Sequence, residues 1–177
     1  MFFVFIVILN IGFLACKKDK MPENDGKAID KSTLYGDWEV THTNAYLIAN
    51  VPIASLGFNP EELLKEKLFN ESVGRTLRFQ KDTVYSIYEG EITQATYYYL
   101  NKDTLFLEKP YLIGTHYTPY FYLKRYEEDE DKLTIYLKKE ESLDLINHDN
   151  HMSALEKGLI KNLTEDAQCE IFIQKTE

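Results

Sequence analysis

The stretch GDWEV, residues 36–40, is where apolar and polar side chains begin to alternate one by one along the chain. In an extended chain, Trp38 and Val40 point to one side while Asp37 and Glu39 point to the other. Three later stretches keep the same period of two: RTLRFQ (75–80), KLTIYLK (132–138) and CEIFIQ (169–174). This alternation predicts antiparallel sheet with one dry face and one solvated face.

Short polar turns separate the alternating stretches. They stand at residues 81–82, 89–90 and 101–103, each between two candidate strands, and this spacing favours hairpins. Eight antiparallel strands joined in this way can close into an up-and-down barrel whose interior holds side chains or one small ligand. The strands are expected at residues 35–44, 75–80, 83–88, 92–101, 104–109, 117–126, 132–139 and 169–175.

Two short helices interrupt the strands, and the predicted fold is therefore mainly β, an eight-stranded antiparallel barrel with two helices. The first helix, at residues 59–72, starts with Asn59 as its cap and Pro60 in its first turn. The second begins at Ser153, with Glu156 completing a capping box. Their apolar stripes are narrow, so we expect both helices against the outside or one end of the sheet. The stripes consist of Leu64, Leu68 and Phe69 in the first helix and Leu155, Leu159 and Leu163 in the second.

Length, charge and composition exclude several classes of protein. The 177 residues suit one domain plus an appendage. A formal net charge of −9 argues against nucleic acid as a partner, because phosphate binding needs a basic face. The 13 tyrosines and 10 phenylalanines fit a pleated surface better than a helix, which agrees with a β protein.

An uncharged apolar segment, residues 2–15, precedes Cys16. As a helix it would be about 21 Å long, too short for a hydrocarbon core of about 30 Å, whereas a secretory leader needs only about 7–15 apolar residues. Residues 13–16, FLAC, resemble a bacterial lipobox, in which the cysteine receives a lipid and the leader is removed. We therefore expect a signal peptide at 1–15, a flexible tether at 16–33 that starts with lipidated Cys16, and a barrel domain at 34–177. The alternative is a plain cleaved leader, or a short anchor with an incidental cysteine.

The glycine and tryptophan of LYGDW, residues 34–38, match the glycine-x-tryptophan pattern of the first lipocalin strand. Together with the lipobox, the tether and the tyrosine-rich hairpins, this pattern resembles the lipocalin-like domains of Gram-negative cell-surface lipoproteins over residues 34–176. The resemblance implies that Gly36 lets the chain bend in tightly and that Trp38 closes the bottom of the barrel. It also implies anchoring to the outer membrane through the lipid, on the periplasmic or the exposed face.

Motifs for catalysis or metal binding are missing from the sequence. It has no GxSxG, HExxH, CxxC or Gly-rich phosphate loop, so we expect neither catalysis nor a cofactor. His148 and His151 supply two ligands where zinc wants three or four, and the acidic run 127–131 lacks the spacing of a calcium loop. An enzyme is the least favoured of three hypotheses, the other two of which are given below. It would need His42, His116 and a carboxylate to cluster.

Aromatic side chains give the better indication of function. Tyr97, Tyr98 and Tyr99 are consecutive, so they must serve both faces of one strand. An interior built from aromatic and aliphatic residues would offer an apolar chamber with a phenol for directional hydrogen bonds. A solid aromatic core is the equally favoured alternative. The candidate lining residues are Trp38, Leu77, Phe79, Tyr98 and Phe121.

These observations lead to two functional hypotheses. In the first, the lipid-anchored barrel binds a small apolar or amphipathic ligand without changing it. In the second, the core is solid, and the acidic tip at residues 127–131 or the tyrosine-bearing outer face docks on another envelope protein. Cys169 opens an alternating strand and is expected to be a small buried hydrophobe without a disulfide partner.

Lipid attachment predicts the behaviour of the two cysteine variants. Cys16→Ser should abolish incorporation of a labelled fatty acid and release the domain into the soluble fraction, because the acceptor thiol is gone. Cys169→Ala is the matched control and should keep the label. Metabolic labelling followed by fractionation measures both. Labelling that persists in Cys16→Ser would rule out anchoring through this residue.

Overall fold

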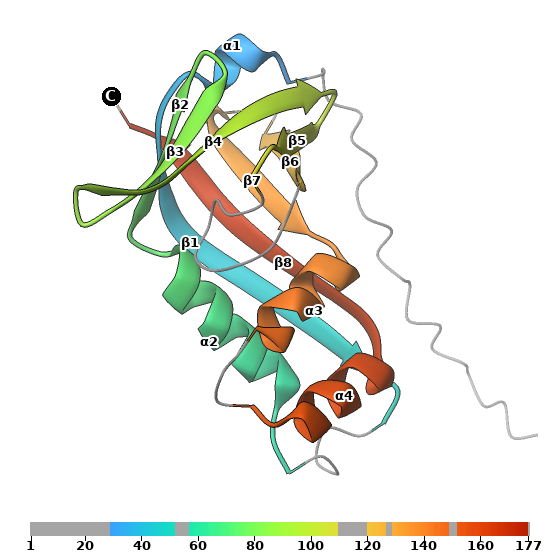
Figure 1. Cartoon of the computed structure of the whole chain (residues 1–177). Coiled ribbons are helices and arrows are strands. Elements are labelled where there is room, and N and C mark those ends of the chain that lie inside the picture. The colour runs from blue at the N-terminus through green and yellow to red at the C-terminus, as the bar shows by residue number, and fades with distance from the viewer. Residues whose placement is uncertain (1–28, 52–56, 110–119, 127–128, 149–151, 177) are drawn as a thin grey trace, which may run out of the picture.

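The computed structural model describes residues 29–51, 57–109, 120–126, 129–148 and 152–176, and the predicted leader, Cys16 and most of the tether lie outside these ranges. The described chain forms eight strands that close into one barrel, in which every strand pairs antiparallel with its sequence neighbours (Figure 1). The strands are β1 (Gly36–Ala49), β2 (Arg75–Gln80), β3 (Thr83–Tyr88), β4 (Glu91–Asn101), β5 (Thr104–Leu107), β6 (Tyr120–Tyr126), β7 (Asp129–Leu137) and β8 (Thr164–Lys175). The predicted fold class is confirmed.

Closure comes from pairing between the first strand and the last. β1 and β8 run antiparallel from Trp38 opposite Lys175 to Ala49 opposite Thr164, with a bulge near Val40. On its other side, β1 pairs with β2 only from Gly36 to Glu39. β7 pairs with the other side of β8 as far as Cys169, which stands opposite Ala45, so beyond Ala45 β1 and β8 continue as a two-stranded ribbon that Figure 1 shows reaching past the short strands.

The described residues contain four helices, where the sequence indicated two. α1 (Lys31–Leu34) lies at one end of the barrel, beside the turn between β2 and β3. α2 (Pro60–Ser72), α3 (Lys139–Asn147) and α4 (Ala154–Leu163) gather at the other end, along the β1–β8 ribbon. α2 packs on β1, and α3 packs on α2 and β8. We call the two ends the α1 end and the helical end.

Several predicted strand boundaries are wrong. The strand expected at 104–109 ends at Leu107, and the one expected at 132–139 begins earlier, at Asp129. The strand expected at residues 132–139 ends at Leu137, because α3 starts at Lys139. β1 continues five residues past its expected end at 44, and β8 starts at Thr164 instead of 169, since the two strands stabilise each other along the ribbon. In α4 the leucine stripe is also wrong: Leu155 and Leu159 are exposed, and Ile160 is the buried residue.

Local contacts explain why the chain turns into the barrel at GDWEV. Gly36 has φ +115°, a conformation that side chains with a Cβ rarely adopt, and an added Cβ would lie 3.2 Å from Cε of Lys175. The Trp38 indole N–H donates to the carbonyl of Leu34 over 2.7 Å, which ties α1 to the start of β1. Asp37 accepts two hydrogen bonds from Arg78, at 2.7 and 2.8 Å, and this pairing holds the pKa of Asp37 below its usual value.

Candidate functional site

The five predicted lining residues all lie in one buried cluster inside the barrel. Trp38 stands opposite Leu77 across β1 and β2, and Phe121 stands opposite Leu105 across β5 and β6. The rings of Phe79 and Tyr98 meet edge-on, with centroids 5.4 Å apart. The structure thus brings these residues together from β1, β2, β4 and β6. Their role in binding a ligand stays a prediction.

Tyr98 is the polar exception within this apolar cluster. Its side chain is 4% exposed, and its hydroxyl has no hydrogen-bond partner among the residues that the structure describes. Burial raises the pKa of this phenol, with smaller contributions from Tyr35 and Asp82, so the hydroxyl keeps its proton at neutral pH. The site is therefore a protonated donor in the buried cluster, for which the described part of the chain offers no acceptor.

The side chain of Lys31 in α1 lies over the Tyr98 ring at the α1 end of the barrel. Its ammonium lies 4.9 Å from the centre of the Tyr98 ring and pairs with Asp82 in the turn between β2 and β3, over 2.5 Å. Both partners of this ion pair are partly exposed, and such surface pairs contribute about 0–1 kcal/mol. The cover over Tyr98 is a single helical turn, held by the buried side chains of Ile29 and Leu34, by a weak ion pair and by the Trp38–Leu34 hydrogen bond.

The helical end is closed more firmly by α3. Leu143, Leu145 and Ile146 are buried, and the Ser142 hydroxyl donates to the carbonyl of Leu137 over 3.0 Å. Cys169 lies fully buried beneath this helix, and burial raises the pKa of its thiol to about 12. The expectation that Cys169 is a buried hydrophobe is confirmed, and its protonated thiol is a poor nucleophile.

An outer aromatic stripe crosses β4, β5 and β6. Tyr97 and Tyr99 are 63% and 59% exposed, which confirms that the three consecutive tyrosines serve both faces of β4. Tyr99 stacks on Phe106 with ring centroids 4.7 Å apart, and Phe106 leads on to Tyr120 at 6.1 Å. The stripe ends at α3, where a hydrogen bond from Tyr120 to the buried carboxylate of Glu141, the largest of several causes, raises the pKa of Tyr120.

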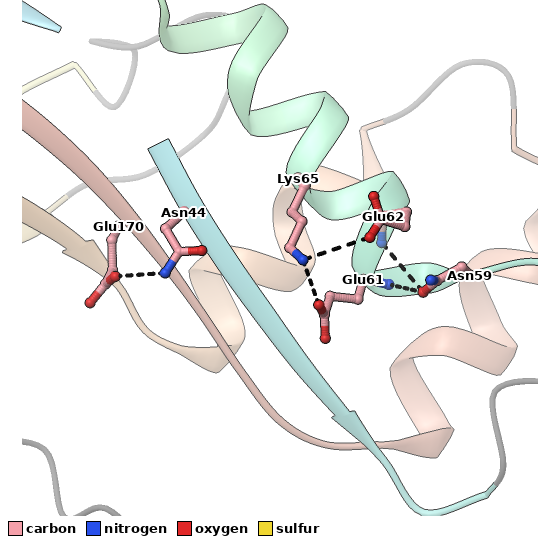
Figure 2. Close-up of polar contacts among 6 residues, drawn as sticks. All are labelled: Asn44, Asn59, Glu61, Glu62, Lys65 and Glu170. Atoms are coloured by element: carbon pink, nitrogen blue, oxygen red, sulfur yellow. Dashed lines mark hydrogen bonds and ion pairs between the residues drawn. The ribbon is translucent and has the colours of Figure 1, made fainter. Parts of the chain in front are cut away.

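A polar groove of about 350 Å³ opens between β1 and α2. Figure 2 shows Asn44 on β1 bonded to Glu170 on β8, and Lys65 on α2 bonded to Glu61 and Glu62. The groove was not predicted from the sequence. It exists because the pairing of β1 with β2 stops at Glu39, which leaves that side of β1 without a neighbouring strand. Its lining consists of Thr43, Asn44, Glu62, Lys65, Glu66 and Phe69.

The histidines and the acidic run do not form a metal site in the described ranges, where no three His, Cys, Asp or Glu side chains are placed to hold an ion. His148 lies against the carbonyl of Asp144, and His42 stacks on Phe172. His116, Asp149 and His151 fall outside the described residues, as does the start of the acidic run. Of the rest of that run, Asp129 pairs with Lys132 and Glu130 pairs with Arg125.

Comparisons with known proteins leave the site to be interpreted from its own geometry. No protein family, curated protein or solved structure matches the chain. In the described part of the chain, each helix is too short or too polar to cross a bilayer.

The contrast between Tyr98 and Tyr120 predicts opposite effects of the same substitution. Tyr98→Phe should leave the free energy of unfolding unchanged or raise it by about 1 kcal/mol, because it removes a buried hydroxyl without a partner. Tyr120→Phe should lower it by about 1–2 kcal/mol, because it takes the donor away from the buried Glu141 carboxylate. Urea unfolding followed by circular dichroism measures both. A clear destabilisation by Tyr98→Phe would mean that its hydroxyl has a partner.

Proposed function

We propose that the protein is a lipid-anchored lipoprotein of the bacterial cell envelope whose lipocalin-like barrel binds a small apolar or amphipathic ligand without catalysis. The observation that carries the proposal is the Tyr98 hydroxyl, a buried donor without an acceptor in an apolar interior. A buried hydroxyl without a hydrogen bond costs about 1–3 kcal/mol. A ligand that presents an acceptor to Tyr98 would recover this free energy on binding.

The two ends of the barrel differ in how easily they could admit such a ligand. Access through the helical end would require moving α3 and its buried leucines. Access through the α1 end requires displacing a single helical turn with its buried Leu34 and the partly exposed Lys31–Asp82 pair, which is a shorter element than the nine-residue α3, and Tyr98 lies directly below that pair. We therefore place ligand access at the α1 end. The proposed tether joins the domain at the same end, so a membrane-derived ligand would meet this end first.

Two naphthalene dyes test the interior site and the role of Tyr98. N-phenyl-1-naphthylamine is largely apolar, and Prodan adds a carbonyl acceptor. Both should bind the full chain saturably, with energy transfer from Trp38, the single tryptophan, as the signal. Tyr98→Phe should weaken the binding of Prodan by about tenfold, because the dye loses one hydrogen bond. The affinity for N-phenyl-1-naphthylamine should stay unchanged.

Each outcome of the dye titrations bears on the proposal. The full chain is kept in a mild detergent, and empty micelles of that detergent give the background fluorescence. Circular dichroism verifies that each sample is folded. The absence of saturable binding by a folded sample would reject the interior site. If Tyr98→Phe weakens the binding of both dyes equally, the hydrogen bond is rejected, while an apolar site remains.

A second candidate function, docking on another envelope protein, is favoured by the outer aromatic stripe. Tyr97 and Tyr99 are exposed, Tyr99 stacks on Phe106, and exposed aromatic side chains of this kind are typical anchors of protein interfaces. The described part of the acidic tip is already occupied by ion pairs with Arg125 and Lys132, so the stripe is the stronger of the two predicted surfaces.

Substitution within the stripe tests the docking function. Tyr97→Ser with Tyr99→Ser should abolish crosslinking to one stoichiometric envelope partner and leave dye binding intact. Ile92→Ser, an equally exposed apolar residue on the same strand, is the control and should keep the partner. Crosslinking in intact cells measures the effect. If the partner remains bound to the double variant, the stripe is not its docking surface.

A further inference from the structure

Helix α4 turns two of its leucines away from the rest of the protein. Leu155 is 73% exposed and Leu159 is 38% exposed, whereas Ile160 is the residue that α4 buries. Residues three and four apart are neighbours on a helix surface, so Leu155 and Leu159 form one apolar face. In α2 and α3, by contrast, leucines are buried. The described part of the chain leaves the apolar face of α4 largely uncovered.

Gly158 lies on the same face, three residues after Leu155 and next to Leu159. A glycine inside a helix is less favourable than alanine, because it loses more conformational freedom on folding. The fold gives no reason for it, since a Cβ added at residue 158 would meet nothing within 4 Å outside the backbone of its own helix. Gly158 therefore weakens the helix and keeps a hollow open beside the exposed leucines.

The shape of this face suits packing against a copy of itself. In knobs-into-holes packing, one side chain enters a hole formed by four residues of the facing helix. Residues at i, i+3, i+4 and i+7 frame such a hole, and α4 has Leu155, Gly158, Leu159 and Asn162 at these positions. Because Gly158 has no side chain, the hole is deep enough to receive a leucine. A patch that carries both the knob and the hole is what a two-fold symmetric contact requires.

Charge favours contact between two copies at this face over the rest of the surface. The chain carries −9, so two copies repel each other in general. Residues 154–163 instead hold two lysines, Lys157 and Lys161, and one acidic residue, Glu156. The carboxylate of Glu156 is already engaged in the capping box with Ser153. Two α4 helices therefore meet without the repulsion of acidic surfaces.

The small size of the contact determines where it forms. α4 has ten residues and is therefore about 15 Å long. A pair of such helices buries less than the roughly 1,200 Å² of a stable standard interface, so association in dilute solution is weak. Chains held in one membrane meet at a higher effective concentration. The dependence on the membrane rests on the lipid anchor of the proposed function, and the packing of α4 does not.

We propose that α4 is the contact between two copies of this protein, paired about a two-fold axis so that Leu159 of each copy is seated over Gly158 of the other. Burial of Leu155 and Leu159 supplies the affinity. The hollow at Gly158 supplies the selection for a second α4 over other apolar surfaces, because a larger side chain there would prevent close approach. The contact uses no residue of the barrel interior or of the outer aromatic stripe.

Cysteine crosslinking of the full chain measures the contact. Lys161→Cys places a thiol at the border of the α4 face, and Lys102→Cys removes the same charge in the turn between β4 and β5. With a short bis-maleimide and the full chain in lipid vesicles, Lys161→Cys should give a crosslinked dimer and Lys102→Cys should not. The parent chain, in which Cys169 is buried, gives the background.

Removing the anchor separates the two proposals. Lys161→Cys combined with Cys16→Ser should crosslink in solution only at high protein concentration, because the contact is small. If this variant crosslinks at the same concentration as the anchored chain, the lipid anchor is rejected and the α4 contact stands.

Variants of the hollow distinguish helix packing from general apolar association. Gly158→Ala should raise the urea midpoint of unfolding, because alanine fits the open space and favours the helix. Gly158→Ile should lower the crosslinked fraction of Lys161→Cys by about tenfold, since it fills the hole. Leu159→Ser should also remove the dimer. Ile92→Ser, which changes an exposed apolar residue on β4, is the control and should keep it.

Several outcomes would overturn the proposal. They are crosslinking of Lys161→Cys no higher than the background, an undiminished dimer in Gly158→Ile, and a lower urea midpoint in Gly158→Ala, which would mean that the fold itself needs the glycine. Protection of the thiol at residue 161 from maleimide by the vesicles would assign the leucines to the lipid surface instead. Crosslinking in intact cells to a different protein, in place of a second copy, would assign them to that partner.

Discussion

The antiparallel pairing between β1 and β8 is the constraint on which the other features of the molecule depend. It joins the two ends of the meander, so each strand of the barrel gains neighbours on both sides and the apolar face of every strand turns inward. Gly36 and the bulge near Val40 let β1 bend into this register, and Trp38 fixes the start of the strand by bonding to the carbonyl of Leu34. Without this pairing, the interior around Tyr98 and the groove beside α2 would both be lost.

Three consecutive tyrosines illustrate how one strand serves two environments. Tyr98 turns its ring into the apolar cluster, where burial keeps the phenol protonated and no described residue accepts its hydrogen. Tyr97 and Tyr99 turn outward and begin a line of rings that reaches Tyr120. In the two proposed functions, the same residue type would provide a hydrogen-bond donor for an enclosed ligand and an aromatic surface for a protein. The two functional candidates are compatible, because the sheet separates them.

The barrel was predictable from sequence because each strand has one dry face, which imposes a period of two on residues such as Leu133 and Ile135. The helix α4 was found through its capping box, which the structure contains. α3 was missed because its cap position is Lys138, which makes no side-chain capping bond. The first residues of β8 were missed because Glu165 and Asp166 are polar and exposed there, and only the partner strand makes them extended. The groove depends on where β2 stops pairing, and no local pattern carries that information.

The direction of β1 has a mechanical consequence. The strand begins at the α1 end, where the preceding chain joins the domain, and it passes the groove before it ends at Ala49. A tension applied between that N-terminal chain and the rest of the barrel would act along β1. The hydrogen bonds to β8 lie perpendicular to the strand, so they would be loaded together in shear rather than opened one at a time. The architecture is therefore suited to resisting a pull on the chain that precedes β1.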